Sequence, residues 1–370
     1  MRFPQFNDEW RQTTLGEIAE VNPTTTKSLP LRFQYIDLES VEKGRIVKNN
    51  VLTREDAPSR AQRILNNGDV IFQMVRPYQQ NNLYFNLKGN IPVVASTGYA
   101  QLRGFQSSLF LYYAVHTPNF LGEVLNRCTG SNYPAINSAD LSTISLSLPS
   151  LAEQEKIASF LSLIDERIQS CSETIKERKR EKVALLNQLF SQKLRFPQFS
   201  DEWQQTTLGE ICTIKTGKLD ANAMIEGGRY PFFTCAKQTY QTDTYSFSGE
   251  AILVAGNGEV GLTKYYNGKF NAYQRTYVLQ SLRRDIILRL IRNYIDYSLP
   301  KRIVSLLNGS AMPYITLSTL RDMPLSLPSL VEQKKIADFL SLIDERIEAE
   351  EELLEQYERQ KRYLLKQMFI

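Results

Sequence analysis

The chain has 370 residues, with 44 Lys and Arg against 40 Asp and Glu, and 42% of its residues are hydrophobic. This length allows two or three domains with real cores, and the composition excludes collagen-like structure and wholesale disorder. No apolar run approaches the roughly 20 residues of a membrane helix, and the first residues lack the apolar segment of a secretory signal. We therefore expect a cytoplasmic protein.

Cysteine and histidine are too sparse for most metal or nucleophile chemistry. The four cysteines, Cys128, Cys171, Cys212 and Cys235, form no CxxC pair, which argues against a disulfide framework and a zinc site. His116 is the only histidine, and we interpret it as a last-turn helix residue facing the helix dipole. A G-x-x-x-x-G-K-[ST] loop and a G-x-S-x-G elbow are also missing from the sequence, so we predict no catalytic residue, metal or cofactor.

The chain is a tandem duplication. Residues 2–18 recur at 195–211 with 15 of 17 positions identical, and residues 146–168 recur at 325–347 with 20 of 23 identical. We call these repeated segments the frame. The sequences between them diverge, so the two halves are expected to share one fold and to differ where readers of different targets would differ.

The end of the chain repeats a segment from its middle. Residues 364–369 match residues 185–190, which lead directly into the second copy of the frame. The chain therefore stops where another copy would begin, and we expect its two termini to lie close together.

The first recognition domain is predicted at residues 1–149. Strands are expected at 69–75 and 91–96, and helices at about 107–116 and 119–127. Groove reading in DNA needs forked donors, amides and cations, which are abundant around the first strand. The candidate DNA-contacting residues of this domain are Arg54, Arg60, Arg63, Gln73, Arg76, Tyr78, Gln79, Gln80, Asn81 and Lys88.

Two long spacer helices are predicted, at residues 150–193 and 329–370. Both begin with Ser-x-x-Glu after a proline, which predicts a capping box. Apolar heptad positions predict that the helices pack as an antiparallel coiled coil about 60 Å long. The alternative is that each helix packs only on its own domain. The predicted packing positions are Ile157, Leu161, Ile164, Ile168, Ile175, Leu185, Leu189, Ile336, Leu340, Ile343, Ile347, Leu354, Leu364 and Met368. The polar residues that interrupt the pattern and would fix its register are Arg178, Lys182, Glu350 and Lys361.

The second recognition domain is predicted at residues 194–328. Its expected strands are 250–255, 264–266 and 276–280, and its expected helices are about 285–297 and 300–307. The candidate DNA-contacting residues are Lys215, Lys218, Lys237, Asn257, Lys264, Lys269, Gln274 and Arg275. We expect an α/β or α+β fold in both domains.

Residues 256–261, Gly-Asn-Gly-Glu-Val-Gly, formally match a dinucleotide-binding loop. A strand and a turn are predicted after this motif, so no helix N-terminus would be available to hold a phosphate. We interpret it as a tight glycine turn that brings backbone close to DNA.

Positive charge gathers in the two predicted recognition domains. Residues 19–146 carry a net charge of +3 and residues 212–325 a net charge of +6. Both values fit a polyanionic partner. Two unlike domains on an antiparallel helix pair would engage DNA sites roughly 34 Å apart and read them in opposite strand senses. The target would then have two unlike halves and an unread spacer whose length the helices set.

The frame resembles that of the specificity (S) subunits of type I restriction–modification enzymes. The most specific likeness is the EQ-K-IA-FLS-IDERI pattern at 153–168 and 332–347. The resemblance implies a non-catalytic subunit that reads double-stranded DNA through two target-recognition domains and docks two DNA adenine methyltransferase subunits. Restriction and translocase subunits would join through those partners, which would bind S-adenosylmethionine, magnesium and ATP themselves.

Two other functions remain open from the sequence. The chain could be a coiled-coil adaptor or scaffold whose two domains bind proteins, or a nucleotide-dependent enzyme built on residues 256–261. A steep fall of DNA affinity with salt would separate the DNA reader from the adaptor.

Overall fold

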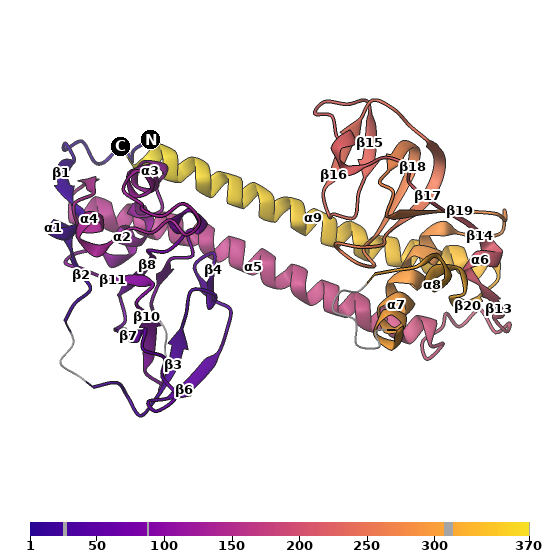
Figure 1. The fold of residues 1–370 in the computed structure, drawn as a ribbon, viewed down its shortest axis with the longest axis horizontal. Coiled ribbons are helices and arrows are strands. Elements are labelled where there is room, and N and C mark those ends of the chain that lie inside the picture. Colours follow the sequence, from indigo (N-terminus) through magenta and orange to yellow (C-terminus); the bar gives the residue numbers. More distant parts are fainter. Residues whose placement is uncertain (25–27, 87–88, 307–313, 370) are drawn as a thin grey trace. The chain divides into compact units, whose positions relative to one another are not determined.

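The computed structural model describes residues 1–24, 28–86, 89–306 and 314–369. The chain forms two compact units: unit 1 is Met1–Ser172 with Glu352–Ile370, and unit 2 is Glu173–Glu351. The boundaries fall inside two long helices, α5 (Leu151–Phe190) and α9 (Leu330–Met368), so each unit contains a part of both (Figure 1). The predicted candidate Lys88 lies outside the described residues.

Unit 1 contains two four-stranded sheets. One has the order β2-β11-β8-β9 and the other β6-β3-β10-β7, in which only β3 and β10 are parallel. A separate pair, β1 with β12, joins the two frame segments, and β4 with β5 forms a small hairpin. The strands are β1 (Arg11–Thr14), β2 (Ala19–Val21), β3 (Arg32–Ile36), β4 (Val41–Glu42), β5 (Arg45–Ile46), β6 (Asn50–Thr53), β7 (Ala61–Ile64), β8 (Val70–Gln73), β9 (Leu83–Tyr84), β10 (Val93–Ser96), β11 (Tyr99–Gly104) and β12 (Ser145–Leu148).

Short helices cover these sheets and carry the largest core of unit 1. Leu15, Phe72, Leu102, Phe110 and Leu141 are fully buried in it, together with apolar residues of α5 and α9. The core therefore fixes the recognition domain to both long helices. The helical elements are α1 (Leu15–Ile18), the 3-10 turn η1 (Pro77–Gln79), α2 (Ser108–Ala114), α3 (Pro118–Asn126) and α4 (Ser138–Ser142).

Unit 2 has one six-stranded sheet with the order β14-β19-β17-β18-β15-β16, and again a frame pair, β13 with β20. Its core is built on Leu208, Ile252, Leu279, Ile291 and Ile295. The elements are β13 (Gln204–Thr207), α6 (Leu208–Ile211), β14 (Cys212–Thr216), η2 (Ala221–Ala223), β15 (Tyr230–Phe233), β16 (Thr239–Thr242), β17 (Phe247–Ala255), β18 (Thr263–Ala272), β19 (Thr276–Ser281), α7 (Leu288–Leu306), α8 (Leu317–Arg321) and β20 (Pro324–Leu327).

The predicted helices of the second domain need a correction. The sequence indicated two helices, at 285–297 and 300–307, whereas the structure has the single helix α7 with Pro300 inside it. Proline usually ends a helix because it lacks an N–H and clashes with the preceding turn, but tertiary packing overrides this preference here. The residues around Pro300 are held by the buried Ile295 and Leu299 of the core. In unit 1 the matching helices, α2 and α3, are separate as predicted, because Thr117 caps α3 and Pro118 begins it.

The predicted strands and the duplication are present. All five predicted strands overlap β8, β10, β17, β18 and β19, although β17 and β18 extend well beyond the predicted bounds. Gly68 and Gly249 match in the duplication, and both have φ of +94°, just before β8 and within β17. The strands in the first part of each domain, such as β3 and β15, were missed by the sequence analysis.

The long helices pack antiparallel within each unit. In unit 1, Asp165 of α5 pairs with Lys361 of α9 at 2.6 Å, and in unit 2 Lys182 of α5 pairs with Asp344 of α9 at 2.5 Å. The interrupting Lys182 and Lys361 therefore contact the opposite helix, where such polar residues set register. The buried packing positions are Ile157, Leu161, Ile164, Ile175, Leu189, Ile336, Leu340, Ile347, Leu364 and Met368, and the half-buried ones are Ile168, Leu185, Ile343 and Leu354.

The predicted capping boxes are formed only in part: the Ser329 hydroxyl accepts a hydrogen bond of 3.5 Å from the Glu332 backbone N–H, but both glutamate carboxylates form ion pairs. Glu153 accepts two hydrogen bonds of 2.7 Å from the Arg2 guanidinium, and Glu332 accepts two of 2.8 Å from Arg195. A planar guanidinium matches a carboxylate at two points, so it displaces the weaker backbone contact. These glutamates therefore anchor the start of each frame copy to the start of each helix. Met1 donates to the Gln367 backbone, which places the two termini close together in unit 1, as expected.

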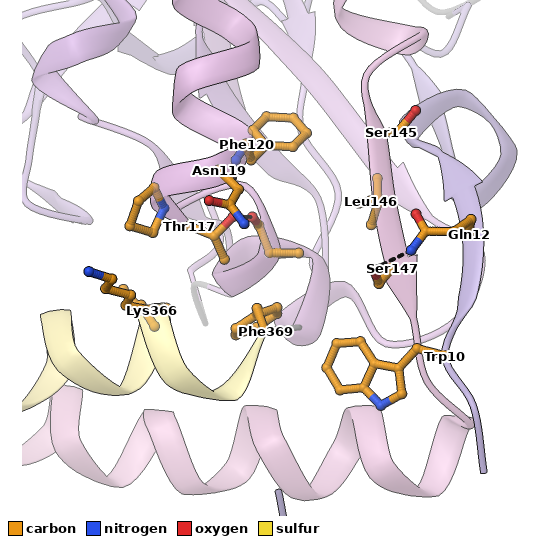
Figure 2. Close-up of a pocket in the computed structure, with 13 residues that line it drawn as sticks. Trp10, Gln12, Thr117, Asn119, Phe120, Ser145, Leu146, Ser147, Lys366 and Phe369 are labelled. Carbon is orange, nitrogen blue, oxygen red and sulfur yellow. Dashed lines mark hydrogen bonds between the residues drawn. The ribbon is translucent and has the colours of Figure 1, made fainter. Parts of the chain in front are cut away.

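Two frame segments and the repeated end of the chain, residues 364–369, pack together in unit 1. Trp10 packs edge-on against Phe369, and Gln12 donates a hydrogen bond of 2.9 Å to Ser147 across the β1–β12 pair (Figure 2). Phe369 also stacks on Phe110 at a ring distance of 5.2 Å.

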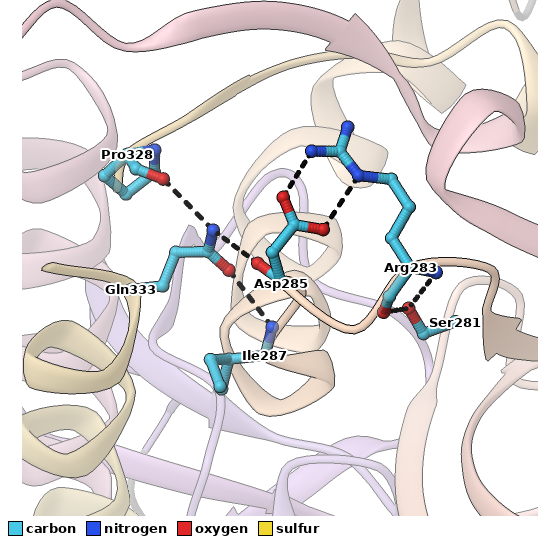
Figure 3. Close-up of polar contacts among 6 residues, drawn as sticks. All are labelled: Ser281, Arg283, Asp285, Ile287, Pro328 and Gln333. Atoms are coloured by element: carbon cyan, nitrogen blue, oxygen red, sulfur yellow. Dashed lines mark hydrogen bonds and ion pairs between the residues drawn. The ribbon is translucent and has the colours of Figure 1, made fainter. Parts of the chain in front are cut away.

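A buried glutamine near the start of each long helix ties the recognition domain to that helix. The Gln333 amide donates to the carbonyls of Pro328 and Asp285, and its oxygen accepts from the Ile287 backbone (Figure 3). In unit 1, Gln154 donates in the same way to the Pro149 carbonyl and to Gln106. Burying a polar side chain is tolerable because every such contact is made. Among the described residues, no helix is long and apolar enough to span a membrane.

Candidate nucleic-acid interface

Four loops of unit 2 meet at one place. They are residues 217–220, 234–238, 256–262 and 273–275, which we call the unit 2 loop end. Backbone hydrogen bonds join them: Gln274 donates to Leu219, Gly256 donates to Arg275, and Glu259 donates to Cys235, at 2.9 to 3.1 Å. Because these contacts are backbone to backbone, the surface side chains of the loops are left free to contact a ligand.

Cys235 and Gly217 let these loops approach one another. The buried Cys235 thiol donates to the Arg275 carbonyl at 3.2 Å. A Cβ on Gly217 would lie 2.0 Å from the carbonyl oxygen of Ala272, which leaves no room for any side chain. Glycine is therefore required at 217 for close approach of two backbones.

Most candidate residues of the second domain belong to the unit 2 loop end. Lys218, Lys237, Gln274 and Arg275 are exposed on its loops, and Asn257 is half-buried there. The other three candidates lie on strands. Lys215 is exposed near the end of β14. Lys264 donates to the Gln238 carbonyl at 3.2 Å and partial burial lowers its pKa. Lys269 lies further along β18, over the Tyr245 ring at 4.7 Å.

The glycine motif at 256–261 forms the loop between β17 and β18. A strand follows it, as the sequence predicted, so it offers no helix N-terminus for a nucleotide phosphate. Gly258 and Gly261 have φ of +61° and +83°, which glycine adopts readily. The Gly256 carbonyl also accepts a hydrogen bond of 2.9 Å from Ile315. The motif is thus a constrained turn within the unit 2 loop end.

Unit 1 has a corresponding loop end, formed by residues 37–40, 74–82, 97–98 and 129–136. Met74 donates to the Gly98 carbonyl at 3.0 Å, Ile136 donates to Met74 at 3.1 Å, and Arg76 donates to Pro134 at 2.7 Å. Three loops follow matching strands in the two units: 37–40 corresponds to 234–238, 74–82 to 256–262, and 97–98 to 273–275. Through these three loops, both loop ends occupy the same place in the fold.

Gln73 does not offer its amide for DNA contact in this structure, contrary to the prediction. Its side chain is buried and donates to the Val75 carbonyl and to Gln79, while its oxygen accepts from the Asn81 backbone. An amide with these partners inside the protein has little capacity left for a base. Gln73 is therefore a positioning residue for the loop at 74–82.

Arg76 is the candidate whose geometry best suits groove contact. Its backbone is left-handed, with φ of +55°, and its guanidinium lies 4.3 Å from the centre of the Tyr133 ring. Tyr133 is 64% exposed and Tyr78 on the neighbouring turn is 52% exposed. Stacked aromatic and guanidinium groups at a loop surface can contact bases and phosphates. Sequence reasoning missed Tyr133, although it lies in a Gly-Ser-x-x-Pro segment (130–134) that the duplication repeats at 309–313.

Most of the remaining candidates of unit 1 lie around this loop end, but Arg54 does not: its backbone N–H donates to the Leu31 carbonyl, at the opposite end of β3. Arg60 is exposed beside Thr97, whose backbone N–H donates to its carbonyl at 2.8 Å. Arg63 on β7 is half-buried, burial lowers its pKa, and its Nε has no hydrogen-bond partner among the described residues. The other four are the exposed Arg54 after β6, and Gln79, Gln80 and Asn81 on or beside η1.

His116 lies just after α2 and beneath the loop at 74–82. Its Nδ1 contacts the Tyr112 carbonyl at 2.6 Å and its Nε2 contacts the Asn82 amide nitrogen at 3.3 Å. Burial lowers its pKa to about 4, so the ring is neutral at pH 7. The neutral ring caps the helix end by hydrogen bonding rather than by its charge. Among the described residues, no group of three or more His, Cys, Asp or Glu could hold a metal ion.

The sequence matches the family model described as the type I restriction modification DNA specificity domain twice, at residues 7–179 and 200–359. It is 41% identical over 157 residues to the type I restriction enzyme EcoDI specificity subunit of Escherichia coli, a match covering 42% of this chain. That match spans 34% of the length of the E. coli protein. This chain is also 24% identical over 307 residues to the MjaVIII specificity subunit of Methanocaldococcus jannaschii, and that match covers 72% of this chain and 70% of that protein.

Two solved structures share the fold. The S subunit of a type I restriction–modification system from M. genitalium aligns with a TM-score of 0.66 and 18% identity, covering 100% of this chain and 99% of that one. A chain from the structural work on assembly and conformational transition of the type I R-M system aligns with a TM-score of 0.54 and 22% identity, covering 98% and 97%.

Proposed function

This chain belongs to the family of type I restriction–modification DNA specificity domains, and from this premise we propose that it is the DNA-reading subunit of such a complex. Each loop end reads one half of a bipartite, asymmetric site in double-stranded DNA. One observation carries the proposal: two chemically different loop ends stand at the same place on two nearly identical frames.

The two loop ends offer different chemistry to DNA. The unit 1 loop end presents Arg76, Tyr78 and Tyr133 with the amides of η1, a set suited to base edges. The unit 2 loop end presents Lys218, Lys237 and Arg275 around a glycine turn, a set suited to phosphates and close backbone approach. Unlike surfaces on a shared frame favour a target with unlike halves.

The long helices also present a repeated outer surface, which supports the docking of two methyltransferase subunits. Lys156, Leu163 and Arg167 are exposed on one face of α5, spaced by seven and four residues. Their counterparts Lys335, Leu342 and Arg346 are identical and exposed on α9. We call these two sets the docking strips. Lys156 and Lys335 also lie over the rings of Phe3 and Phe196, at 5.7 and 5.8 Å. The exposed leucines and arginines are the pairs whose match two copies of one partner would require.

Exchanging one recognition block tests the assignment of loop ends to half-sites. Residues 19–145 are replaced by the matching block of a relative, and methylated adenines are mapped across a genome. We expect one half of the recognised site to change and the other half to stay the same. The matched control exchanges residues 212–324 and should change only the other half. Changes in both halves after either exchange would refute modular reading.

Salt dependence separates DNA reading from an adaptor role. Neutralising several phosphates releases counterions, so affinity of the complex with its methyltransferase for duplex DNA should fall steeply between 50 and 200 mM salt, by roughly 10³-fold or more. A flat response to salt would favour protein binding by the two domains.

The docking strips are tested by replacing the leucine at the centre of each strip with a charged residue. Leu163→Arg or Leu342→Arg should each reduce the bound methyltransferase from two copies to one, and the double variant should bind none. Val183→Arg is the matched control, because Val183 is 58% exposed on α5 and its counterpart in the duplication is already Arg362. Two bound copies in both single variants would remove the strips from the interface.

The helices would also set the unread spacer of the DNA site. Lengthening α5 and α9 together by about one turn, four residues, should lengthen that spacer. An unchanged spacer in the methylation map would show that the helices do not measure it.

A further inference from the structure

A small pocket of about 220 Å³ opens in unit 1 between the frame and the recognition domain. Figure 2 shows Thr117, Asn119 and Phe120 at the start of α3 on one side, and Lys366 of α9 with Phe369 just after that helix on another. Trp10, which precedes β1, Gln12 of β1 and Ser147 of β12 complete it among others. The lining therefore combines aromatic faces with several hydrogen-bonding groups.

The duplication shows what fills the matching place in unit 2. Residues 115 and 118 of unit 1, a valine and a proline, correspond to Tyr294 and Tyr297. These two rings lie 4.9 and 5.5 Å from the ring of Phe190, which is the counterpart of Phe369. Lys301 covers the outer face of Tyr297 at 3.7 Å and donates to Asn187. Of the two unit 1 counterparts, Pro118 lines the pocket, so Tyr297 occupies in unit 2 the place that Pro118 leaves open in unit 1.

The exposed fractions of the aromatic side chains around the two places differ in the same sense. Phe190 and Trp203 of unit 2 are each only 7% exposed, whereas their counterparts Phe369 and Trp10 are half-buried. In unit 2, burial raises the pKa of the Tyr294 hydroxyl, and the backbone of Ser326 is near enough to oppose that shift in part. The counterpart of Ser326 is Ser147, which lines the open pocket. The pocket of unit 1 therefore keeps Phe369 and Ser147, the counterparts of residues that lie beside the tyrosines in unit 2.

Size restricts the occupant to a single ring. Pockets for cofactors and drug-sized ligands usually measure about 300–1,000 Å³, so this one is too small for them. Protein interfaces, by contrast, often rest on one aromatic side chain seated in a pocket with a polar rim. Gln12, Asn119 and Lys366 supply such a rim here.

We propose that this pocket receives the phenol ring of a tyrosine side chain presented by a partner polypeptide. The site lies apart from the loop end and from the docking strip of unit 1, so it does not rest on the proposed function. Because unit 2 fills its own copy, the partner engages one unit of the chain and not the other.

Two probes test the pocket: 4-methylphenol and the tripeptide N-acetyl-Gly-Tyr-Gly-amide. Trp203→Phe leaves Trp10 as the only tryptophan, and its fluorescence, excited where tyrosine does not absorb, reports binding to the full chain. We expect one saturable site per chain and an affinity for the tripeptide at least equal to that for 4-methylphenol. If 4-methylphenol binds while the tripeptide binds about tenfold more weakly, a polypeptide occupant is refuted.

Variants that fill or open the pocket supply the control. Pro118→Tyr introduces the residue found at the matching position of unit 2 and should weaken tripeptide binding by about tenfold or more. Gly122→Tyr places the same side chain elsewhere on α3, where nothing lies within 4 Å of its Cβ, and should leave binding unchanged. Unchanged binding in the Pro118 variant would overturn the proposal. If that variant is poorly folded, Ser145→Tyr fills the pocket from β12 and must have the same effect.

Removing a tyrosine from the matching place in unit 2 should create a second binding site. Tyr297→Ala should raise the number of tripeptide sites, measured by equilibrium dialysis, from one to two per chain. A single site in this variant would refute the equivalence of the two places. Methylation mapping of the Pro118 variant distinguishes this proposal from the proposed function, because an unchanged recognition site leaves the DNA-reading role intact whatever the tripeptide does.

Discussion

Unit 2 carries its recognition strands in one six-stranded sheet, whereas unit 1 divides the same plan between two sheets of four. The difference centres on one strand. In unit 2, β18 runs unbroken from Thr263 to Ala272, pairing first with β17 and then, at its end, with β15. In unit 1 the equivalent path is interrupted after β9 and resumes as β10, which pairs with β3. Unit 1 therefore has β9 and β10 in different sheets, whereas β18 makes both pairings within one sheet.

Both units nevertheless place their loop ends at the same position. The frame supplies this constancy through the β1–β12 and β13–β20 pairs, the Arg2–Glu153 and Arg195–Glu332 ion pairs, and the buried helix glutamines. Between these anchors the variable sequence of unit 1 adds the β4–β5 hairpin and strand β7, which have no counterpart among the described residues of unit 2. The comparison teaches that recognition chemistry can change while the scaffold that presents it does not.

The largest effect should come from the core shared by recognition domain and helices. Leu161→Ala and Leu340→Ala remove fully buried counterparts in units 1 and 2, and each should lower the free energy of unfolding by about 2–5 kcal/mol. The exposed Leu163→Ala and Leu342→Ala should change it by less than about 0.5 kcal/mol. Denaturant titration measures all four. Similar losses in the exposed and buried pairs would contradict the packing.

Acid should weaken unit 1 through His116, whose counterpart in unit 2 is Ile295. Its pKa falls to about 4 in the folded chain, against about 6.5 when unfolded, so only the unfolded chain takes up a proton between these values. Stability is therefore complete above pH 6.5 and declines by up to about 3 kcal/mol as pH falls to 4. His116→Ile should remove this part of the pH dependence in thermal melts at pH 7 and pH 5. If the His116→Ile variant loses as much stability between pH 7 and pH 5 as the unchanged chain, other titrating groups cause the loss.

A smaller loss of unfolding free energy is expected at Gly217, where two backbones of the unit 2 loop end come close together. Gly217→Ala forces a Cβ against the Ala272 carbonyl and should cost about 1–3 kcal/mol of unfolding free energy while impairing methylation that depends on one half-site. Gly122→Ala in α3 has open space around its Cβ and should instead stabilise the chain by about 0.5–1 kcal/mol. Calorimetry compares the two directly. Equal effects of both substitutions would show that position 217 tolerates a side chain.

The smallest effect is expected at the Arg76–Tyr133 stack, which unit 2 lacks among its described residues. Arg76→Lys keeps the charge but loses the planar fork, so DNA affinity should fall by about 1 kcal/mol, roughly fivefold, with relaxed specificity in one half-site only. Tyr133→Phe keeps the ring and serves as the control. Binding assays on duplexes altered in either half-site measure the change. A uniform loss across all sequences would indicate a phosphate contact instead.

The sequence by itself determined the plan of the molecule. Two near-identical frame segments required one fold used twice, and heptad spacing interrupted by Lys182 and Lys361 predicted paired helices, because a helix period fixes which residues share a face. The strand–turn–strand reading of the glycine motif at 256–261 followed equally from local residue preferences.

Only the tertiary structure decided what depends on contacts between distant residues. Gln73 became a buried positioning group because Val75, Gln79 and Asn81 surround its amide, and no local pattern reports such burial. The carboxylates of Glu153 and Glu332 bind arginines far away in sequence, which the capping motifs did not indicate, although the helices begin where those motifs predicted. Sheet order, the continuity of α7 through Pro300 and the open pocket at Pro118 likewise depend on which side chains meet in space, whereas sequence spacing encodes only neighbours along the chain.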